Sequence, residues 1–380
     1  MHYQLQLSHG HILCVSLLTC LITITYYIPN KRNGTQGVFP KNSEMIGRQN
    51  EDRSNFTNNK VILLWNTFYQ NRHFGAGAFG QEPFRRNKCK VNTCSLETER
   101  RFLINATAVV FHIRNKMTPF PSHVNSRQLF VYFLREAPPA TYGNSPRYRT
   151  RFNVTMTYRS DSDIPVPISR YVKRTEVTRR KYTLKYRLSD KTGYVVWLVS
   201  HCRTSSKREQ YVSSLAKYIP VDVYGACGKY NCSTNIVCMT SFERKYKFYL
   251  SFENSYCRDY VTEKYYKTLK YEIIPIVYGR ANYSKLGLPN SYVNILDYRS
   301  PKHLARHLKF LSRNETAYVT YFQTRRLWKS VNVLGKAFCD LCELVHNESF
   351  RRIYSDVHKW WITDACDMNT VKNVIASATE

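Results

Sequence analysis

The stretch YKFYLSFENSYCRDYVTEKYYKTLKYEIIPIVYG, residues Tyr246–Gly279, decides the fold. It begins as an apolar, aromatic strand that the polar turn ENSYCRD ends, and after a segment opening with Val-Thr-Glu-Lys it closes in the β-branched strand IIPIVYG. A strand, turn, helix and strand form a βαβ-type unit, in which ligands bind at the carboxyl ends of the strands against the helix N-terminus. At this turn Glu263 would accept hydrogen bonds from sugar or ribose hydroxyls, and Lys264 would meet a phosphate. The plainer interpretation is an ordinary βαβ unit whose helix starts with charged residues.

Short β-branched or aromatic runs precede this unit in two series. They are Val61–Tyr69, Ala108–Ile113 and Leu129–Leu134 in the first series, and Gly193–Ser200 and Pro220–Gly225 in the second. Helix-like segments such as Lys207–Lys217 and Ser300–Leu311 alternate with the second series, and Ser300-Pro301 is a typical helix start. Buried parallel strands alternating with helices predict an α/β protein with two Rossmann-like domains facing a cleft. A basic, Thr-rich stretch near residues 173–191 joins the two series.

Length and charge set wide limits on function. The chain has 380 residues, enough for two medium domains and a tail, and its formal net charge of +30 implies anionic partners. Nucleic acid, acidic glycans, lipid headgroups and nucleotide diphosphates all qualify, and a solvated basic surface is the alternative. The sequence contains no nucleic-acid-binding motif.

The twelve cysteines indicate an oxidising compartment. Cys14 and Cys20 lie in the apolar N-terminal stretch, which leaves ten beyond it. Cys339 and Cys342 form a CxxC, but no second CxxC or histidine pair at zinc spacing accompanies it. Structural disulfides are therefore favoured over a metal or redox site, with Cys89 and Cys94 as candidate partners, and the pairing stays open.

Eight Asn-x-Ser/Thr sequons agree with a glycoprotein of the secretory pathway. They lie at Asn33, Asn55, Asn105, Asn153, Asn231, Asn282, Asn314 and Asn347. Residues Ile12–Ile28 carry no charge and are just long enough to cross a bilayer as a signal-anchor. A cleaved signal is the alternative, although no small-x-small cleavage site stands out after this segment. The basic pair Lys31 and Arg32 after this segment opposes a luminal C-terminus by the positive-inside rule, but the sequons and cysteines favour one.

Several motifs together resemble the α1,3-fucosyltransferases, glycosyltransferase family 10, which transfer fucose from GDP-fucose to a GlcNAc hydroxyl. The FENS…Val-Thr-Glu-Lys run at residues 252–264 resembles the donor-site signature of that family. The remaining matches, from about Val61 to Cys366, are ILLW, TYRSDSD, DVYGACG, SPKHLARHL and the closing CxxC…HNE…WW…C pattern.

The resemblance implies the two-domain glycosyltransferase fold called GT-B, behind a membrane anchor. The implied divisions are a cytoplasmic tail (1–11), a transmembrane signal-anchor (12–28), a stem (29–59), an acceptor-side domain (60–190) and a GDP-fucose-binding domain (191–380). The implied location is the Golgi membrane, single-pass type II, with the catalytic part in the lumen. The expected partners are GDP-fucose and an N-glycan acceptor on glycoproteins, without nucleic acid.

Transfer with inversion needs a base for the acceptor hydroxyl and positive groups for the departing GDP. Glu136 is the candidate base, because it follows the Leu129–Leu134 strand within a Glu-x-Pro that resembles the family's, although the neighbouring Arg135 would lower its basicity. A surface-loop glutamate is the alternative. Asp161-Ser162-Asp163 belongs to TYRSDSD, which in the family lies outside the donor site. No obligatory metal or other cofactor is expected, and stimulation by a divalent cation stays open.

For the diphosphate the resemblance implies Lys264 and Arg208, with Arg203 and Lys207 as alternatives to Arg208. Glu263 is assigned to fucose or ribose hydroxyls, and Tyr249 is either a pocket residue or a core residue. The complete expected donor site is Ser200, Arg208, Tyr249, Asn254, Tyr260, Val261, Thr262, Glu263 and Lys264.

Two positions depart from the family pattern: His201 replaces an asparagine after Val199-Ser200, and Ile168 replaces a tyrosine after Pro167. The DVYGACG, cysteine and WW features look most like the invertebrate and plant enzymes that fucosylate the innermost, or core, GlcNAc of N-glycans. Lewis-type enzymes, which act on antennal LacNAc or LacdiNAc, are the first alternative. An inactive, transferase-fold glycan-binding protein is the second alternative.

Overall fold

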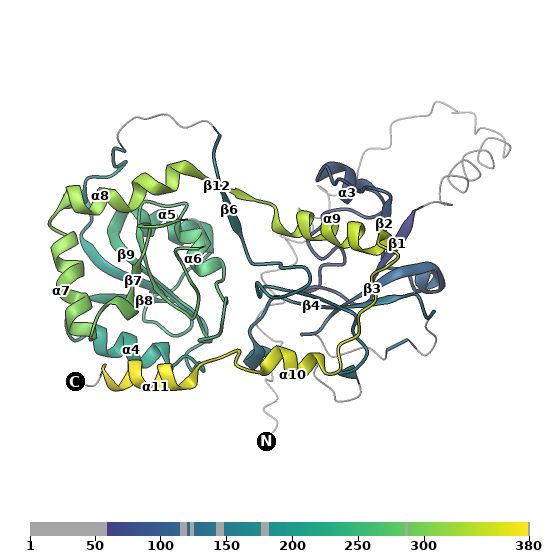
Figure 1. The fold of residues 1–380 in the computed structure, drawn as a ribbon. Helices are drawn as coiled ribbons and strands as arrows, with labels where there is room; N and C mark the ends of the chain where they lie inside the picture. The colour runs from purple at the N-terminus through teal and green to yellow at the C-terminus, as the bar shows by residue number, and fades with distance from the viewer. Residues whose placement is uncertain are drawn as a thin grey trace, which may run out of the picture. The chain divides into compact units, whose positions relative to one another are not determined.

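The computed structural model describes residues 59–114, 120–121, 125–141, 148–175, 182–285 and 288–378 (Figure 1). The expected tail, signal-anchor and stem lie outside the described residues, apart from Asn59. Within the described part, no helix combines the length and apolarity needed to cross a membrane. Residues Asn58–Glu380 group into one compact unit.

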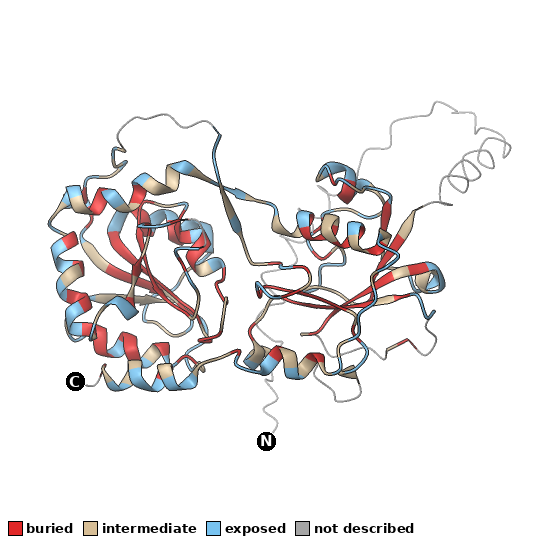
Figure 2. Ribbon diagram, in the orientation of Figure 1, coloured by how far each residue is buried: buried red, intermediate tan, exposed pale blue. Residues whose placement is uncertain are grey.

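A five-stranded parallel sheet forms from the first series of apolar runs. Its strands are β1 (Lys60–Leu64), β2 (Cys94–Glu97), β3 (Ala106–His112), β4 (Leu129–Leu134) and β5 (Val154–Thr157), in the order β2-β1-β3-β4-β5. Residues of β3 and β4 are almost all buried, as expected of continuous apolar runs covered on both faces (Figure 2). The three strands expected in this region are confirmed.

The second series forms another five-stranded parallel sheet, again as expected. Its strands are β7 (Gly193–Leu198), β8 (Val221–Tyr224), β9 (Tyr246–Phe252), β10 (Ile274–Tyr278) and β11 (Val293–Asn294), in the order β11-β10-β9-β7-β8. The Tyr246–Gly279 stretch supplies β9, α6 (Glu263–Thr268) and β10, so the predicted βαβ unit is confirmed. All seven residues of β9 are buried, which places this strand in the middle of the core.

Helices flank both sheets. The α-helices are α3 (Glu82–Arg86), α4 (Arg208–Leu215), α5 (Asn235–Lys245), α7 (Pro301–Leu311), α8 (Glu315–Gln323), α9 (Val333–His346), α10 (Val357–Ile362) and α11 (Met368–Ala376). Short 3-10 helices occupy Arg100–Asn105, Pro138–Ala140, Leu188–Asp190, Ile295–Asp297 and Thr324–Leu327. The predicted helices near residues 207–217 and 300–311 correspond to α4 and α7 and are confirmed.

The C-terminal segment returns to the first sheet. Strands β6 (Arg170–Lys173) and β12 (Trp328–Val331) pair antiparallel as the chain passes between the two sheets in each direction. Phe338 and Leu341 of α9 then join the hydrophobic cluster of β1 and β3, and Trp361 of α10 joins the cluster on the other face. The expected domain boundary at residue 190 does not account for this return. The return depends on packing between segments far apart in the sequence, which the sequence pattern does not show. The domain limits otherwise stay a prediction.

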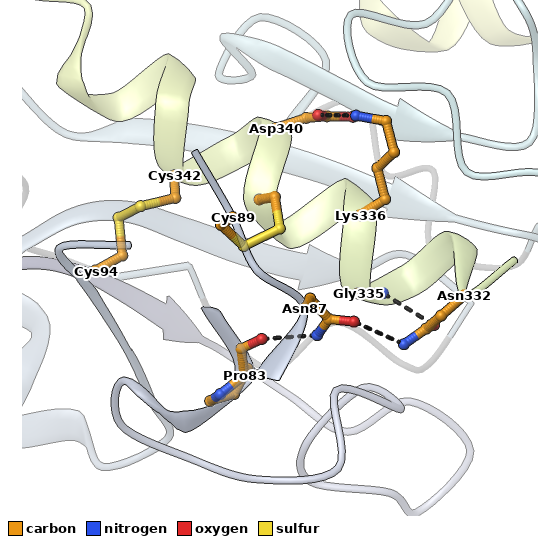
Figure 3. The surroundings of a disulfide bond; sticks show 10 residues. Pro83, Asn87, Cys89, Cys94, Asn332, Gly335, Lys336, Asp340 and Cys342 are labelled. Atoms are coloured by element: carbon orange, nitrogen blue, oxygen red, sulfur yellow. Dashed lines mark hydrogen bonds and ion pairs between the residues drawn. A yellow bond between two sulfur atoms is a disulfide. The ribbon is translucent and has the colours of Figure 1, made fainter. Parts of the chain in front are cut away.

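Five disulfides fasten the described chain. They join Cys89 to Cys339, Cys94 to Cys342, Cys202 to Cys227, Cys232 to Cys238, and Cys257 to Cys366. Figure 3 shows the first two, which attach α9 to the segment before β2 and to β2 itself. The preference for structural disulfides, with Cys89 and Cys94 as partners of the CxxC, is confirmed. Both sulfurs of the CxxC are therefore engaged and are not available as zinc-binding thiolates.

Candidate active site

A cavity of about 410 Å³ lies where strands of both sheets end, and its size is typical of a site for a small molecule. Glu136 reaches it from the loop after β4, Ser200 from the loop after β7 and Asn254 from the turn after β9. Carboxyl ends of parallel strands are the usual place for ligands in such sheets. Nine of the ten residues expected from the sequence line this cavity: Glu136, Ser200, Arg208, Tyr249, Asn254, Tyr260, Thr262, Glu263 and Lys264.

Val261 is the exception among the expected residues. It is 3% exposed and packs in a hydrophobic cluster with Tyr265 and Tyr266 instead of lining the cavity. Its neighbours Tyr260 and Thr262 both line the cavity, and the backbone at Thr262 is extended, a conformation in which successive side chains point to opposite sides. The structure therefore gives Val261 a packing position.

The Glu136 carboxylate is held by three side chains. Oε1 accepts a hydrogen bond from the hydroxyl of Tyr69 and lies 2.9 Å from Nη1 of Arg114. Oε2 accepts a hydrogen bond of 3.0 Å from the hydroxyl of Tyr260, which belongs to the turn after β9. Burial, together with the Glu136 contact, raises the pKa of Tyr69 well above its ordinary value, so the phenol stays a donor. The carboxylate is thus oriented from both sheets.

Arg208 is the first residue of α4, and its guanidinium is turned inward. Nη1 donates to the backbone oxygen of Phe252 at 2.5 Å, and Nε is buried without a partner. Burial lowers the pKa of Arg208, so the site holds a partly desolvated cation with unused donor capacity. The alternatives Arg203 and Lys207 are exposed and do not line the cavity. An anion entering the cavity would satisfy the free donor of Arg208.

Lys264 lies in a cluster of charges at the start of α6. Its Nζ donates to Thr262 Oγ1 at 2.7 Å and to Glu253 Oε2 at 3.2 Å, and Glu263 Oε1 lies 3.7 Å away. Burial opposes the ammonium form, but Glu253 and Glu263 outweigh that effect and hold the pKa of Lys264 above its usual value. Lys264 is therefore positively charged at neutral pH.

Tyr249, for which the sequence left open a pocket position and a core position, occupies both. It is 5% exposed and packs in a core cluster with Val196 and Phe242, and it also lines the cavity. Asn254 contributes a buried Oδ1 without a partner, an acceptor available to a ligand's N–H or O–H group.

The sequence did not point to several other residues of the cavity wall. They are Arg114, Ala140, Leu198, Asn235, Met239, Lys267 and Thr268. Arg114 follows strand β3, so the rule that located Glu136 would also have found it. Asn235 and Met239 lie one helical turn apart on α5, which no residue pattern marked as a wall of the site.

Both departures from the family pattern occur in the wall, since His201 and Ile168 line the cavity. Arg135, which the sequence singled out only as a neighbour of Glu136, also lines it. Its Nη2 donates to the backbone oxygen of Pro167 at 2.9 Å, and burial lowers its pKa to about 10.

The aspartates of TYRSDSD serve structural contacts. Asp161 accepts hydrogen bonds of 2.6 Å from both Arg159 and Arg258. Asp163 accepts from the backbone N and the hydroxyl of Thr155, and it also pairs with Arg352. These carboxylates are therefore occupied in joining β5 to later segments of the chain.

Two family models match consecutive parts of the chain. "Fucosyltransferase, N-terminal" matches residues 57–169, and "Glycosyltransferase family 10 (fucosyltransferase) C-term" matches residues 188–360. The chain is 33% identical to Drosophila melanogaster α-(1,3)-fucosyltransferase C over 331 residues, which cover 80% of this chain and 77% of the relative. It is also 33% identical to Drosophila melanogaster glycoprotein 3-α-L-fucosyltransferase A over 315 residues, which cover 80% of this chain and 60% of the relative.

A crystal structure of an α1,3-fucosyltransferase with GDP-fucose aligns with a TM-score of 0.49 and 17% identity, covering 78% of this chain and 93% of that one. The two family models and the Drosophila relatives agree with the motifs quoted from the sequence. The chain therefore belongs to glycosyltransferase family 10, the fucosyltransferases.

Proposed function

We propose that this glycosyltransferase moves L-fucose from GDP-fucose to O3 of a GlcNAc in glycoprotein N-glycans. The observation that carries the proposal is that the carboxylate of Glu136 and two cations, the buried Arg208 and the partly exposed Lys264, line one cavity. Two family relatives are named as α1,3-fucosyltransferases, and this supports the same linkage here.

In the proposed step Glu136 takes the proton of the acceptor hydroxyl while its oxygen attacks C1 of fucose. The bond from C1 to the β-phosphate oxygen breaks, and the electron pair leaves with GDP. Arg208 and Lys264 stabilise the negative charge that develops on the diphosphate. Attack from the side opposite the leaving group inverts the configuration at C1, and no bound metal is required in this step.

The architecture is proposed to be GT-B, with an acceptor-side domain built mainly from residues 60–190, to which α9 and α10 return, and a donor domain built from the rest of residues 191–380. Two parallel sheets whose strand ends reach a common cavity support this assignment. The signal-anchor, stem and luminal Golgi location also remain part of the proposal. The five disulfides support an oxidising compartment.

The innermost GlcNAc of the N-glycan is the proposed acceptor. A relative named glycoprotein 3-α-L-fucosyltransferase A, at 33% identity, supports a glycoprotein substrate. The antennal alternative has its own support, because a Bos taurus enzyme named 4-galactosyl-N-acetylglucosaminide 3-α-L-fucosyltransferase 9 aligns over 92% of this chain at 28% identity.

One competition experiment separates these acceptors. Residues 58–380, which form one compact unit, would be secreted and given GDP-fucose with a GlcNAc-terminated N-glycopeptide and free N-acetyllactosamine together. Mass spectrometry of the products should place fucose on the innermost GlcNAc. Fucose only on N-acetyllactosamine would replace the core acceptor by the antennal one, and binding of glycan with no transfer would favour the inactive alternative.

The variant Lys264→Ala serves as the control for catalysis. It removes the cation for the leaving diphosphate, so transfer should fall by at least about a hundredfold. An inactive glycan-binding protein would bind glycan as before with this variant. Equal transfer by the variant and the wild type would contradict the proposed role of Lys264.

A further inference from the structure

The carboxylate of Glu253 is an unassigned charge beside the proposed donor site. Its side chain is 0% exposed at the end of β9, directly before Asn254. Taking a carboxylate fully out of water is strongly unfavourable unless other groups compensate for the lost hydration. A buried charge at this place therefore requires specific partners.

Those partners all belong to the start of α6. Oε1 of Glu253 accepts from the backbone N of Thr262 at 2.8 Å and from its hydroxyl at 3.0 Å. Oε2 lies 2.8 Å from the same hydroxyl and 3.2 Å from Nζ of Lys264. Burial raises the pKa of Glu253, while Lys264 and Thr262 oppose that shift and favour the ionised form.

The geometry also limits where Lys264 can point. Its side chain is 24% exposed, and its Nζ is tied to Glu253 and to the hydroxyl that Glu253 itself holds. Glu263, the other acidic neighbour, is 50% exposed and farther away, at 3.7 Å. Glu253 is therefore the buried anchor of the lysine, while Glu263 stays accessible in the cavity.

We propose that Glu253 is a positioning residue, which holds the Lys264 ammonium at the place where the diphosphate of the donor binds. The proposal rests on the proposed function, since it assigns Lys264 to a nucleoside diphosphate. Glu253 does not touch the donor itself and acts only through Lys264. Fixing the cation before the donor arrives reduces the reorganisation needed during transfer.

A double-mutant cycle on GDP binding tests the proposal. Glu253→Gln still accepts from Thr262, but it presents an amide donor to Lys264, so GDP affinity measured by calorimetry should fall about tenfold. Lys264→Met should weaken binding by about a hundredfold, and adding Glu253→Gln to it should have no further effect. If the two effects multiply, or if Glu253→Gln binds GDP like the wild type, Glu253 does not act through Lys264.

The matched control is Glu272→Gln. Glu272 is also buried, at 8% exposure, and its carboxylate accepts from the backbone N of Lys185, outside the cavity. It should lower stability without changing GDP affinity. An equal loss of GDP affinity in this control would show general loosening of the domain and would overturn the proposal.

A second readout does not depend on donor binding. NMR of lysine labelled with ¹³C at Cε should show that the pKa of Lys264 falls in Glu253→Gln, and an unchanged pKa would overturn the proposal. If the wild-type protein does not bind GDP, the proposed function fails, and this titration then decides only whether Glu253 holds Lys264. If Glu253→Gln does not fold, Glu253→Asp replaces it in the cycle. The shorter side chain should reduce, but not abolish, the coupling between positions 253 and 264.

Discussion

At the residue scale, the contacts of Glu136 can be related directly to its proposed role as the base. The hydroxyl of Tyr69 donates to Oε1, the kind of contact that an acceptor hydroxyl must make before Glu136 can remove its proton. Tyr69 and Gln70 both have left-handed backbones, with φ of 48° and 67°, which non-glycine residues seldom adopt. This backbone directs the phenol onto the carboxylate. In the proposed mechanism Tyr69 would therefore hold the position on Oε1 that the acceptor hydroxyl takes.

Removing that hydroxyl should therefore favour competing nucleophiles. Tyr69→Phe is expected to lower KM for the acceptor about threefold and to raise hydrolysis of GDP-fucose in the absence of acceptor, because water gains access to Oε1. Release of free fucose measures the hydrolysis, and Glu136→Gln, the control, should abolish both reactions. A lower kcat with unchanged hydrolysis would show instead that Tyr69 supports the base.

His112, at the end of β3, is a buried titratable residue with a consequence for stability. It is 0% exposed, its Nδ1 lies 3.0 Å from the backbone oxygen of Thr67, and burial lowers its pKa to about 4. An unfolded histidine titrates near about 6.5. As the pH falls from about 6.5 to 4, the unfolded chain takes up a proton that the folded chain does not, and stability is lost across that window.

The change in stability should be visible in a comparison with His112→Phe. The wild-type free energy of unfolding should fall by about 3 kcal/mol more than that of the variant between pH 7 and pH 4. Denaturant titrations at several pH values measure the difference, and the values at pH 7 correct for altered packing. Parallel curves for the two proteins would mean that His112 is protonated without cost in the folded state.

The sequence predicted which residues lie at the cavity better than it predicted what each of them contacts. Glu263 and Lys264 were predictable because a charged pair follows the end of an apolar strand, where ligands bind. Glu253 lies in the same motif, but its proposed positioning of Lys264 depends on complete burial. The burial of a single glutamate cannot be predicted from the sequence. Val261 was expected in the cavity wall but does not line it. The sequence does not give the local backbone conformation that decides which side chain faces the cavity.

At the element scale, strands and their parallel pairing followed from continuous apolar runs. The attachment of α9 and α10 to the first sheet did not, because amphipathic helices fit more than one sheet and only long-range packing selects the partner. The disulfides strengthen that attachment, since Cys94 and Cys342 are 248 residues apart in the chain. Closing so long a loop restricts the unfolded chain strongly.

Opening that loop should cost measurable stability. Because Cys89–Cys339 closes almost the same loop, both disulfides must be removed to open it. The variant with alanine at Cys89, Cys94, Cys339 and Cys342 is expected to lower the free energy of unfolding by about 2–5 kcal/mol. Guanidinium titration would give the loss, and Cys232→Ala/Cys238→Ala, which opens a loop with a separation of only 6 residues, is the matched control with a smaller loss. Equal losses in the two variants would contradict the loop-length argument.

At the scale of the whole molecule, the cationic side chains at the cavity are expected to take the place of a metal in the proposed step. Among the described residues, one group of metal-ligand type stands out, Cys94, Cys342 and His346, and its two sulfurs are bonded to each other. The net charge of +30 belongs to this scale as well, because it enriches anionic donors near the surface without specifying any site.

Metal removal is the corresponding test. Fucose transfer in excess EDTA should keep at least about half of the activity measured without chelator, because Arg208 and Lys264 supply the positive charge. Added Mn²⁺ serves as the companion measurement for stimulation. A loss greater than about tenfold that Mn²⁺ restores would require a metal in the mechanism.

The return of the chain to its first sheet also sets an order of events during synthesis. Ile62 and Leu63 of β1 share their clusters with Phe338 and Trp361, which leave the ribosome almost three hundred residues later. All five strands of the first sheet are made by Thr157, so the late arrivals are the covering helices α9 and α10. The nascent first sheet must therefore wait, with Cys89 and Cys94 still reduced or wrongly paired, until the end of translation supplies its missing helices. Any premature stop before α10 would leave the earliest-made half of the protein as a substrate for chaperones and quality control.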